Sequence, residues 1–472
     1  MKNLAAHSHL SNRTAAGVAF SMPNSIRYHV AGALCAAIAT APTPGAAQTV
    51  TPVEQRIRAH VEANTESAIA LLERSVNINS GTMNKAGVEA VGMLFAGELQ
   101  PLGFRTSWIA MPPVVNRAGH LVAERQPRRR RGRAAPLRIL LIGHLDTVFE
   151  GEGQQFVRTD SIGTGAGASD MKGGIVVMVQ ALKALASVGA LDDMHVIVVL
   201  TGDEENAGDP MELARDDLIR AARRSDLVLS FEGGSDSTAV VARRGSSDWV
   251  LEVTARQYHS SGMFREGAGY GAIYEAARVL TEFRTALAGQ PLLSFSPGVI
   301  VGGEKVSYDT TMMTGTASGK TNIVPPSAFV HGDLRFITEG QLDSARTVMR
   351  EIVARSLPGT SSAIHFSKSY YPAMAPTPAN YSLVATYDTV SRALGYAPVV
   401  GNDPGRRGAG DISFVAPIIP GLDGLGVFGS GEHSPREAVN LTSLPKQTSR
   451  AALLMYRLSR DSARTRRKLS SK

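Results

Sequence analysis

Three short runs of apolar residues, each followed directly by a turn and by acidic or histidine residues, constrain the fold of this chain most. These runs, which we predict to be strands, are Leu137 to Ile142, His195 to Leu200 and Leu227 to Phe231. A stretch with helical character, Gly174 to Ala186, lies between the first two runs and is preceded by Asp170 and two glycines. Strand, loop, helix and strand at this spacing predict an α/β domain with a largely parallel sheet.

The length of the chain and a change in its pattern predict a second, smaller domain. With 472 residues, the chain exceeds the size that one hydrophobic core usually serves. After Arg243 the pattern changes to two alternating strands, Asp248 to Thr254 and Phe329 to Phe336, with a helix between them, Ala272 to Leu287. We therefore predict a main domain over 48–242 and 369–460, an inserted α+β unit over 243–368, and a basic tail over 461–472.

Further helices and one more strand are expected to complete the main domain. Apolar residues recur at helical spacing in four segments, Val53 to Asn77, Val88 to Leu102, Tyr381 to Leu394 and Ser449 to Leu458. A glycine-rich segment, Leu425 to Phe428, is predicted as a strand of the main sheet.

The composition is that of a soluble globular protein, with 43% hydrophobic and 19% charged residues and 47 glycines. The net charge of +7 is concentrated in Arg128 to Arg131 with Arg133, and in the tail residues Arg464, Arg466, Arg467, Lys468 and Lys472. We interpret the first group as a solvated loop and the second as a frayed terminus. No basic stripe with interleaved aromatic residues accompanies the charge, which argues against a nucleic-acid partner.

The N-terminus has the pattern of an export signal. Arg27 and His29 precede an apolar run, Val30 to Ala41, and small residues follow up to Ala47. We expect cleavage after Ala47, so that residues 1–47 form a signal peptide and the mature chain is periplasmic or secreted. Met22 is an alternative start, and a buried N-terminal helix is the structural alternative to a signal.

The only cysteine, Cys35, lies inside this apolar run and would leave with it. Leu34 stands where a lipoprotein signal needs a small residue, and the run is too short to span a bilayer, so we expect no stable membrane anchor. The mature chain would then contain no thiol. Histidine and carboxylate side chains must therefore hold any metal ion.

Two motifs beside the first predicted strand and helix suggest metal ligands. His144, in Gly143-His144-Leu145-Asp146-Thr147, follows a strand directly, and Asp146 lies close enough in sequence to orient its ring. Asp170 lies in a glycine-rich segment, Gly165 to Gly174, that lacks the third glycine of a dinucleotide loop. Asp170 is either an ordinary helix N-cap or a carboxylate that bridges two metal ions, and the flanking glycines favour the bridge.

Three consecutive acids, Asp203, Glu204 and Glu205, follow the second predicted strand. A solvated loop would explain them, but a bound cation would also offset their mutual repulsion, with one Glu as ligand and its neighbour as general base. Glu232 follows the third strand, and His433 lies in a late loop. Two histidines and at least three carboxylates suit zinc, cobalt or manganese, and could hold two ions if one carboxylate bridges.

The order and spacing of these motifs resemble the two-zinc exopeptidases typified by carboxypeptidase G. The matching segments are HLDT, GxGxxDMKGG, DEE, SFE and a late EHS, within Val53 to Leu458. The family also contains acetylornithine deacetylase, succinyl-diaminopimelate desuccinylase, aminoacylase and several dipeptidases. The resemblance implies a zinc-exopeptidase catalytic domain with an inserted lid and dimerisation domain.

The resemblance also implies a role for each motif residue. His144, Asp170 and Glu232 would hold one zinc ion, and Asp170, Glu205 and His433 the other, with Asp170 bridging. Glu204 would be the general base, and Asp146 the partner of His144. A cis peptide bond is expected between Asp170 and Met171.

In the inserted unit the resemblance implies that His259, within Tyr258-His259-Ser260-Ser261-Gly262, reaches the active site of a second subunit and stabilises the reaction's oxyanion. Asn322 and Arg335 match family residues that contact the substrate, and an Arg fork suits a substrate carboxylate. A homodimer through the lid follows from these roles.

One departure concerns substrate choice. Tyr371 stands where glutamate-releasing relatives tend to have arginine, and Arg406 or Arg407 could supply the missing charge, although exposed loop arginines are the alternative. We predict hydrolysis of an amide or peptide bond beside a free C-terminal carboxylate, as in a glutamate carboxypeptidase. Alternatives with the same machinery are an N-acyl-amino-acid deacylase and a dipeptidase. A non-catalytic metal- or substrate-binding protein is a further alternative, which the Glu204-Glu205 pair argues against.

Overall fold

The computed structural model describes residues 50–128, 135–151, 155–310 and 312–470. The predicted signal peptide, 1–47, and the arginines from Arg129 to Arg133 lie outside the described residues.

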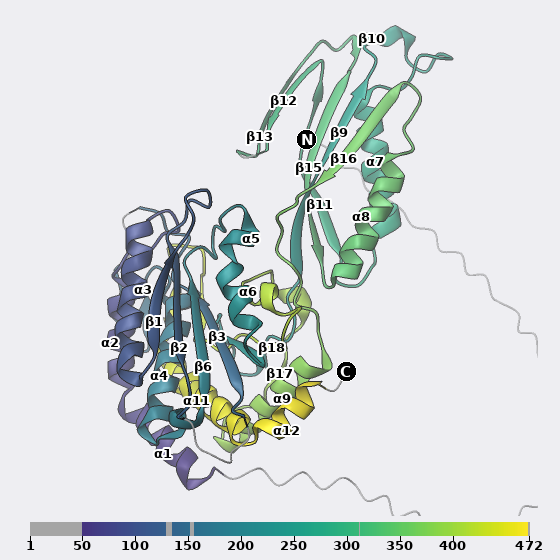
Figure 1. The fold of residues 1–472 in the computed structure, drawn as a ribbon. Coiled ribbons are helices and arrows are strands. Elements are labelled where there is room, and N and C mark those ends of the chain that lie inside the picture. The colour runs from purple at the N-terminus through teal and green to yellow at the C-terminus, as the bar shows by residue number, and fades with distance from the viewer. Residues whose placement is uncertain (1–49, 129–134, 152–154, 311, 471–472) are drawn as a thin grey trace, which may run out of the picture. The chain divides into compact units, whose positions relative to one another are not determined.

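The main domain is built on a sheet of six strands in the order β1-β2-β6-β3-β7-β18 (Figure 1). Strand β3 pairs in parallel with β6 and β7, and β18 pairs in parallel with β7, whereas β1 and β2 run antiparallel at one edge. The strands are β1 (Arg105–Ala110), β2 (Gly119–Arg125), β3 (Arg138–His144), β6 (His195–Thr201), β7 (Leu227–Ser230) and β18 (Gly421–Leu422).

Both faces of this sheet are covered, which explains why its central strands read as continuous apolar runs. Ile139 and Leu141 of β3 pack into one core, while Leu140 and Ile142 pack into the other. The helices of the first core are α1 (Pro52–Ala63), α2 (Thr65–Val76), α3 (Lys85–Leu99), α4 (Gly173–Ser187), α9 (Pro378–Ala393) and α11 (Ser443–Arg460). Those of the second are α6 (Asp216–Ala222) and α10 (Ile412–Val415). The predicted α/β class is confirmed.

The first predicted helix, Val53 to Asn77, is two helices, α1 and α2, separated at Asn64. Helix α1 begins with a capping box, in which the Thr51 hydroxyl accepts from the Glu54 N–H and the Glu54 carboxylate accepts from the Thr51 N–H. At Asn64 the side-chain amide donates to the backbone O of His60 at 2.7 Å. An asparagine side chain bonded to the backbone in this way competes with the hydrogen bonds of a helix, which explains the break at Asn64. The apolar periodicity continues across the break and therefore predicted one helix.

The strand predicted over Leu425 to Phe428 is wrong. The main sheet is completed instead by β18, whose two residues are too few to leave a sequence pattern. Leu425 and Val427 are buried in the core without being strand residues, and Phe428 begins a strand of another sheet. That sheet has the order β19-β20-β5-β4, with strands Phe428–Ser430, Ala438–Asn440, Ile162–Thr164 and Val157–Thr159.

A second, antiparallel sheet follows in the sequence, in the order β11-β15-β9-β16. Alternate residues of β9, Trp249, Leu251 and Val253, pack with two helices into a separate core. The sheet strands are β9 (Gly245–Ala255), β11 (Ser294–Gly303), β15 (Ser327–Phe336) and β16 (Thr360–Phe366), and the helices are α7 (Ala272–Leu287) and α8 (Glu339–Val353). The predicted α+β insertion is confirmed as an architecture, while its limits at 243 and 368 stay predictions.

Two chain segments connect this insertion to the main sheet, and they are hydrogen-bonded to each other. Arg243 and Met374 exchange two backbone bonds of 3.0 Å, and Ser246 and Tyr371 exchange bonds of 2.9 and 3.0 Å. The two crossings therefore form one short antiparallel ladder and not two independent linkers.

The expected frayed terminus is an ordered helix, α12 (Ser462–Ser470), over the described part of the tail. Arg466 donates to the backbone O atoms of Ala135 and Pro136 and pairs with Asp226 at 2.9 Å. The prediction of a frayed terminus is therefore wrong for these residues, because Arg466 has fixed partners. None of the helices among the described residues is long and apolar enough to cross a bilayer.

The remaining elements are short. They are β8 (Thr238–Ala239) with β17 (Val400–Gly401), β10 (Tyr258–His259) with β14 (Ile323–Val324), β12 (Lys305–Asp309) with β13 (Thr314–Ser318), α5 (Met211–Ala214), and the single turns η1 (Gln100–Leu102), η2 (Ala168–Lys172), η3 (Ala190–Asp193), η4 (Ser260–Gly262) and η5 (Pro404–Arg406).

Candidate metal centre

The carboxyl ends of the parallel strands carry most of the predicted ligands. His144 is the last residue of β3, Glu204 and Glu205 follow β6, and Glu232 follows β7. Asp170 lies in the turn η2, immediately before α4. Since adjacent parallel strands end at the same edge of a sheet, these side chains are brought to one place.

Five side chains, His144, Asp170, Glu205, Glu232 and His433, form what we call the ligand cluster. On one side, Nε2 of His144 lies 3.2 Å from Asp170 Oδ1 and 3.6 Å from Glu232 Oε1. On the other side, Nε2 of His433 lies 3.2 Å from Asp170 Oδ2 and 3.1 Å from Glu205 Oε2. Asp170 thus offers one carboxylate oxygen to each group.

These separations suit divalent cations. Four ligands at about 2.0–2.1 Å from a tetrahedral zinc ion lie roughly 3.3 Å from one another. The four contacts above, 3.1 to 3.6 Å, lie close to that spacing. Ligand atoms of His144, Asp170 and Glu205 all fall within 4.8 Å of one another. The donor set, two imidazoles and three carboxylates, fits two ions.

The acids of this site repel one another. Burial, with repulsion from nearby Asp170 and against the opposing charge of His144, raises the pKa of Glu232 to about 8 and that of Glu205 to about 7. Burial also raises the pKa of Glu204 well above its usual value. A bound cation stabilises the charged form of such buried, mutually repelling carboxylates, because its positive charge offsets both burial and repulsion.

His144 has a fixed ring orientation. Its Nδ1–H donates to the backbone O of Asp146 at 3.0 Å, so Nε2 is the ring atom that faces the ligand cluster. Burial opposes a charged ring, but hydrogen bonds with Asp146 and Asp170 hold the pKa of His144 well above its ordinary value.

Asp146 does more than contact His144. Its Oδ1 accepts from the backbone N–H of Glu204 at 3.0 Å, and its Oδ2 accepts from that of Glu205 at 3.1 Å. The Thr82 hydroxyl also donates to Oδ2 at 2.7 Å. The fully buried Asp146 carboxylate therefore fixes the backbone of the acidic loop, Asp203 to Glu205, relative to β3.

Glu437, which the sequence analysis did not single out, holds the turn that carries Asp170. Its carboxylate accepts three backbone N–H bonds of 2.8 to 2.9 Å, from Gly167, Ser169 and Asp170. The peptide bond between Asp170 and Met171 is cis, as predicted. Glu437 lies far from this turn in sequence, so no local pattern reveals the contact.

A buried ion-pair network holds the acidic loop in place. The Arg215 guanidinium, with no exposed surface, donates to Asp203 Oδ1 at 2.6 Å and to Asp411 Oδ1 at 2.8 Å. Asp203 also accepts from the backbone N–H of Gly208 at 2.9 Å. The first of the three consecutive acids is therefore structural, and the two that follow are left for the site.

Tyr371 does not replace the missing substrate arginine. Its hydroxyl donates to the backbone O of Glu204 at 2.9 Å, and its ring packs on Phe414 with centroids 5.1 Å apart. Burial raises the pKa of this hydroxyl. Tyr371 is thus a neutral support for the acidic loop.

The three site residues predicted in the insertion are not in contact with the ligand cluster within the described residues. His259 is exposed, its Nδ1 lies 2.8 Å from the Ser261 hydroxyl, and the N–H of Ser260 donates to the backbone O of Asn322 at 2.9 Å. Arg335 pairs with Asp333 at 2.9 Å. His259 and Asn322 therefore lie together, while Arg335 is placed apart on β15.

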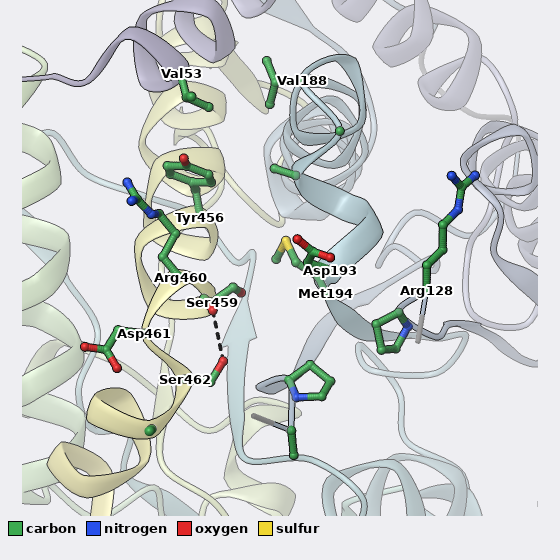
Figure 2. Close-up of a pocket in the computed structure, with 16 residues that line it drawn as sticks. Val53, Arg128, Val188, Asp193, Met194, Tyr456, Ser459, Arg460, Asp461 and Ser462 are labelled. Carbon is green, nitrogen blue, oxygen red and sulfur yellow. Dashed lines mark hydrogen bonds between the residues drawn. The ribbon is translucent and has the colours of Figure 1, made fainter. Parts of the chain in front are cut away.

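A pocket lies at the opposite ends of the main strands (Figure 2). Its lining includes Pro136, just before β3, and Ser459 and Ser462, between which Figure 2 marks a hydrogen bond. The seven residues of β3, from Arg138 to His144, separate this pocket from the ligand cluster by about 20 Å. The pocket is not part of the candidate centre.

The model of "Peptidase family M20/M25/M40" matches residues 140–457, which include all five residues of the ligand cluster. The chain belongs to this family. It is therefore a hydrolase of a metallopeptidase family, and the predicted family resemblance is confirmed.

The proteins similar to this chain have names that describe different activities. Carboxypeptidase G2 from Pseudomonas sp. (strain RS-16) is 26% identical over 448 residues, covering 90% of this chain and 97% of that protein. Succinyl-diaminopimelate desuccinylase from Acidiphilium cryptum (strain JF-5) is 27% identical over 364 residues, covering 74% and 88%. The Bacillus subtilis YXEP protein, a dinuclear metal binding peptidase of the M20 family, has a similar fold with a TM-score of 0.58 at 13% identity, covering 84% and 99%.

Proposed function

We propose that this chain hydrolyses an amide or peptide bond beside a free C-terminal carboxylate, as a glutamate carboxypeptidase does. The observation that carries the proposal is the shared carboxylate of Asp170, which contacts His144 and His433 with different oxygens beside the acid Glu204. The similarity to carboxypeptidase G2 over nearly the full length of both chains supports this substrate class.

In the proposed reaction the ligand cluster would hold two divalent ions, zinc in the first place and cobalt or manganese as alternatives. Such ions would polarise the scissile carbonyl and lower the pKa of the attacking water. Glu204 removes the proton from this water and later delivers it to the leaving amine, so that one water is consumed for each bond broken. Asp146 keeps the Glu204 backbone in place during both transfers.

The insertion would complete the site in a homodimer. We propose that His259 of a second copy stabilises the oxyanion, and that Asn322 and Arg335 hold the substrate's carboxylate. The exposed position of His259, with only local partners, is consistent with a role toward another molecule. Sedimentation of the purified chain tests this part, and a monomer at working concentration would exclude it.

Two alternatives use the same machinery. The similarity to succinyl-diaminopimelate desuccinylase favours an N-acyl-amino-acid deacylase as the second candidate, and a dipeptidase would need recognition of a free amino group.

We also propose export through the N-terminal signal, which the N-terminal sequence of the protein recovered outside the cytoplasm would test. An intact N-terminus would contradict cleavage.

The test of function is a substrate panel. Zinc-loaded protein is given N-acyl and peptidyl derivatives of glutamate, aspartate and neutral amino acids, and simple dipeptides, each with and without a chelator. We expect chelator-sensitive release of a C-terminal amino acid. Turnover restricted to N-succinyl or N-acetyl substrates would favour the deacylase, and absence of turnover by protein holding two ions would contradict hydrolysis of this class.

A further inference from the structure

Arg407 lies beside the candidate metal centre. It follows the turn η5, and its Nη2 donates to the backbone O of Gly233 at 2.8 Å. Gly233 directly follows Glu232, and successive Cα atoms are about 3.8 Å apart. The half-buried Arg407 guanidinium is therefore next to the strand end that carries a candidate ligand.

This guanidinium has unused hydrogen-bond donors. Within the described residues, Nε and Nη1 of Arg407 have no hydrogen-bond partner, and no carboxylate lies within ion-pair distance. The nearby carboxylate of Asp423 is already taken, since Arg243 Nε donates to it at 2.6 Å and the Gly424 N–H donates at 2.6 Å. Arg407 thus contributes to lowering the pKa of Asp423 without an ion pair.

Another half-buried arginine near the acidic loop shows the contrast. Arg117 also lacks an ion pair within the described residues, but its three side-chain nitrogens all donate to oxygens of Asn116, Asn206 and Ala207. Arg117 is therefore fully used in joining two loops. Arg407 makes a single bond and keeps two nitrogens for another molecule.

The loop around Arg407 is both fixed and uncrowded. Arg243 Nη1 donates to the backbone O atoms of Gly408 and Ala409, each at 3.2 Å, and Arg244 Nη2 donates to that of Gly405 at 3.4 Å. A Cβ atom added at Gly233 or at Gly408 would meet no heavy atom within 4 Å. The backbone is thus held on either side of Arg407, and there is open space at Gly233, the residue that accepts its hydrogen bond and follows Glu232.

We propose that Arg407 binds the side-chain carboxylate of the residue released, so that the substrate is an N-acyl or peptidyl derivative of an acidic amino acid. The inference rests on the proposed function, in which Arg335 and Asn322 take the main-chain carboxylate. A second carboxylate beside the metal centre needs a second cation. Nη2 of Arg407 uses one of its two N–H groups for Gly233, so its other N–H, together with that of Nε or Nη1, can form a forked, charge-assisted pair with this carboxylate.

The experiment compares two substrates that differ in charge and little in size, the same acyl group on glutamate and on glutamine. The ratio of kcat/KM for the two is measured on zinc-loaded full-length protein for the wild type, Arg407→Gln and Arg406→Gln. Arg406, the adjacent exposed arginine with no side-chain bond among the described residues, is the matched control. Because both substrates are measured on one preparation, a partly unfolded variant leaves the ratio unaffected.

We expect the wild type to prefer the glutamate substrate, and Arg407→Gln to lower that preference roughly tenfold or more, the loss of a charge-assisted bond. Arg406→Gln should leave it unchanged, and Arg407→Lys should retain part of it. Equal loss in both glutamine variants, or a wild type indifferent to the charge, would overturn the role of Arg407 while leaving the hydrolase intact. Absence of turnover on the whole panel would instead remove the proposed function itself.

Discussion

Glu204 combines the two properties that a general base needs, a fixed position and a raised proton affinity. Its backbone is held by Asp146 and by the Tyr371 hydroxyl, and burial, with repulsion from Glu232, raises its pKa. Cations bound at the neighbouring ligands would lower this pKa again, which favours the deprotonated form that a general base needs.

Glu204→Gln should therefore remove proton transfer and leave metal binding intact. We expect kcat to fall by about 10²–10⁴-fold, the usual contribution of a general base. Metal content per chain should not change, because Glu204 belongs to neither half of the ligand cluster. Metal analysis and steady-state kinetics on the same sample check both expectations, with Glu351→Gln, at an exposed position of α8, as control. A variant that kept substantial activity would assign the base elsewhere.

At the scale of residues, the sequence predicts those site residues whose position follows from the local structure alone. His144, Glu205 and Glu232 were predicted because each follows an apolar run, where a ligand has no packing role. Glu437 and Arg215 could not be predicted, since their function is to hold loops that are distant in sequence. Such contacts exist only after the chain has folded, and they leave no spacing to recognise.

At the scale of elements, burial decides what can be predicted. Strands β3, β6 and β7 are buried on both faces and read as apolar runs, so their limits were close to those found. Strand β18 has two residues and no such run, which is why the nearby apolar segment Leu425 to Phe428 was taken as the strand. Apolar character indicates burial, and only length and alternation indicate a strand.

Helix α12 offers a test of an element that the charge pattern predicted to be a frayed terminus. Asp226 accepts from Arg138 at 2.6 Å and from Arg466 at 2.9 Å. Burial opposes these contacts, but together they lower the pKa of Asp226 in the folded state. A depressed pKa stabilises the fold above the unfolded value, near 3.9, and this contribution is lost as the pH falls through the folded one.

Arg466→Ala should lower the free energy of unfolding by about 1 kcal/mol at pH 7, at the low end for charge-assisted bonds because the side chain is partly exposed. The difference from wild type should shrink as the pH falls below about 4, the pKa of Asp226 in the unfolded chain, and the part due to the ion pair should be lost below the lowered pKa of the folded state. Urea unfolding at several pH values measures this. Arg464→Ala, on an exposed position of the same helix, should be neutral throughout, and an equal loss of stability in the two variants would mean that the ion pair with Asp226 is not responsible.

At the scale of the whole molecule, the candidate centre joins parts of the chain that are far apart in sequence. Its ligands come from positions 144 to 433, after three strands of the main sheet, before α4 and within the late loop of His433. The unfolded chain cannot assemble this set. An ion bound there therefore stabilises the folded state, by an amount that grows with the logarithm of its concentration over its Kd.

Removal of metal should consequently destabilise the molecule, in a pH-dependent way. In the metal-free fold the pKa of His433 is raised to about 9, by its hydrogen bond to Asp170 against burial and by nearby acids, and burial raises that of Glu232 to about 8. Both groups carry protons at pH 7, and an ion must displace them. Metal affinity should thus rise between pH 6 and pH 8, and binding should release protons.

The measurement is the thermal unfolding midpoint of metal-free protein with added zinc, across this pH range. At free zinc 100 times the Kd, the gain in stability is about 2.7 kcal/mol for one site. Calorimetric titration in buffers with different ionisation enthalpies gives the number of protons released. His433→Ala should reduce both the stabilisation and the proton count, whereas His365→Ala, on β16 outside the ligand cluster, should change neither. A stabilisation that is constant with pH, or protons taken up, would contradict the proposed ligands.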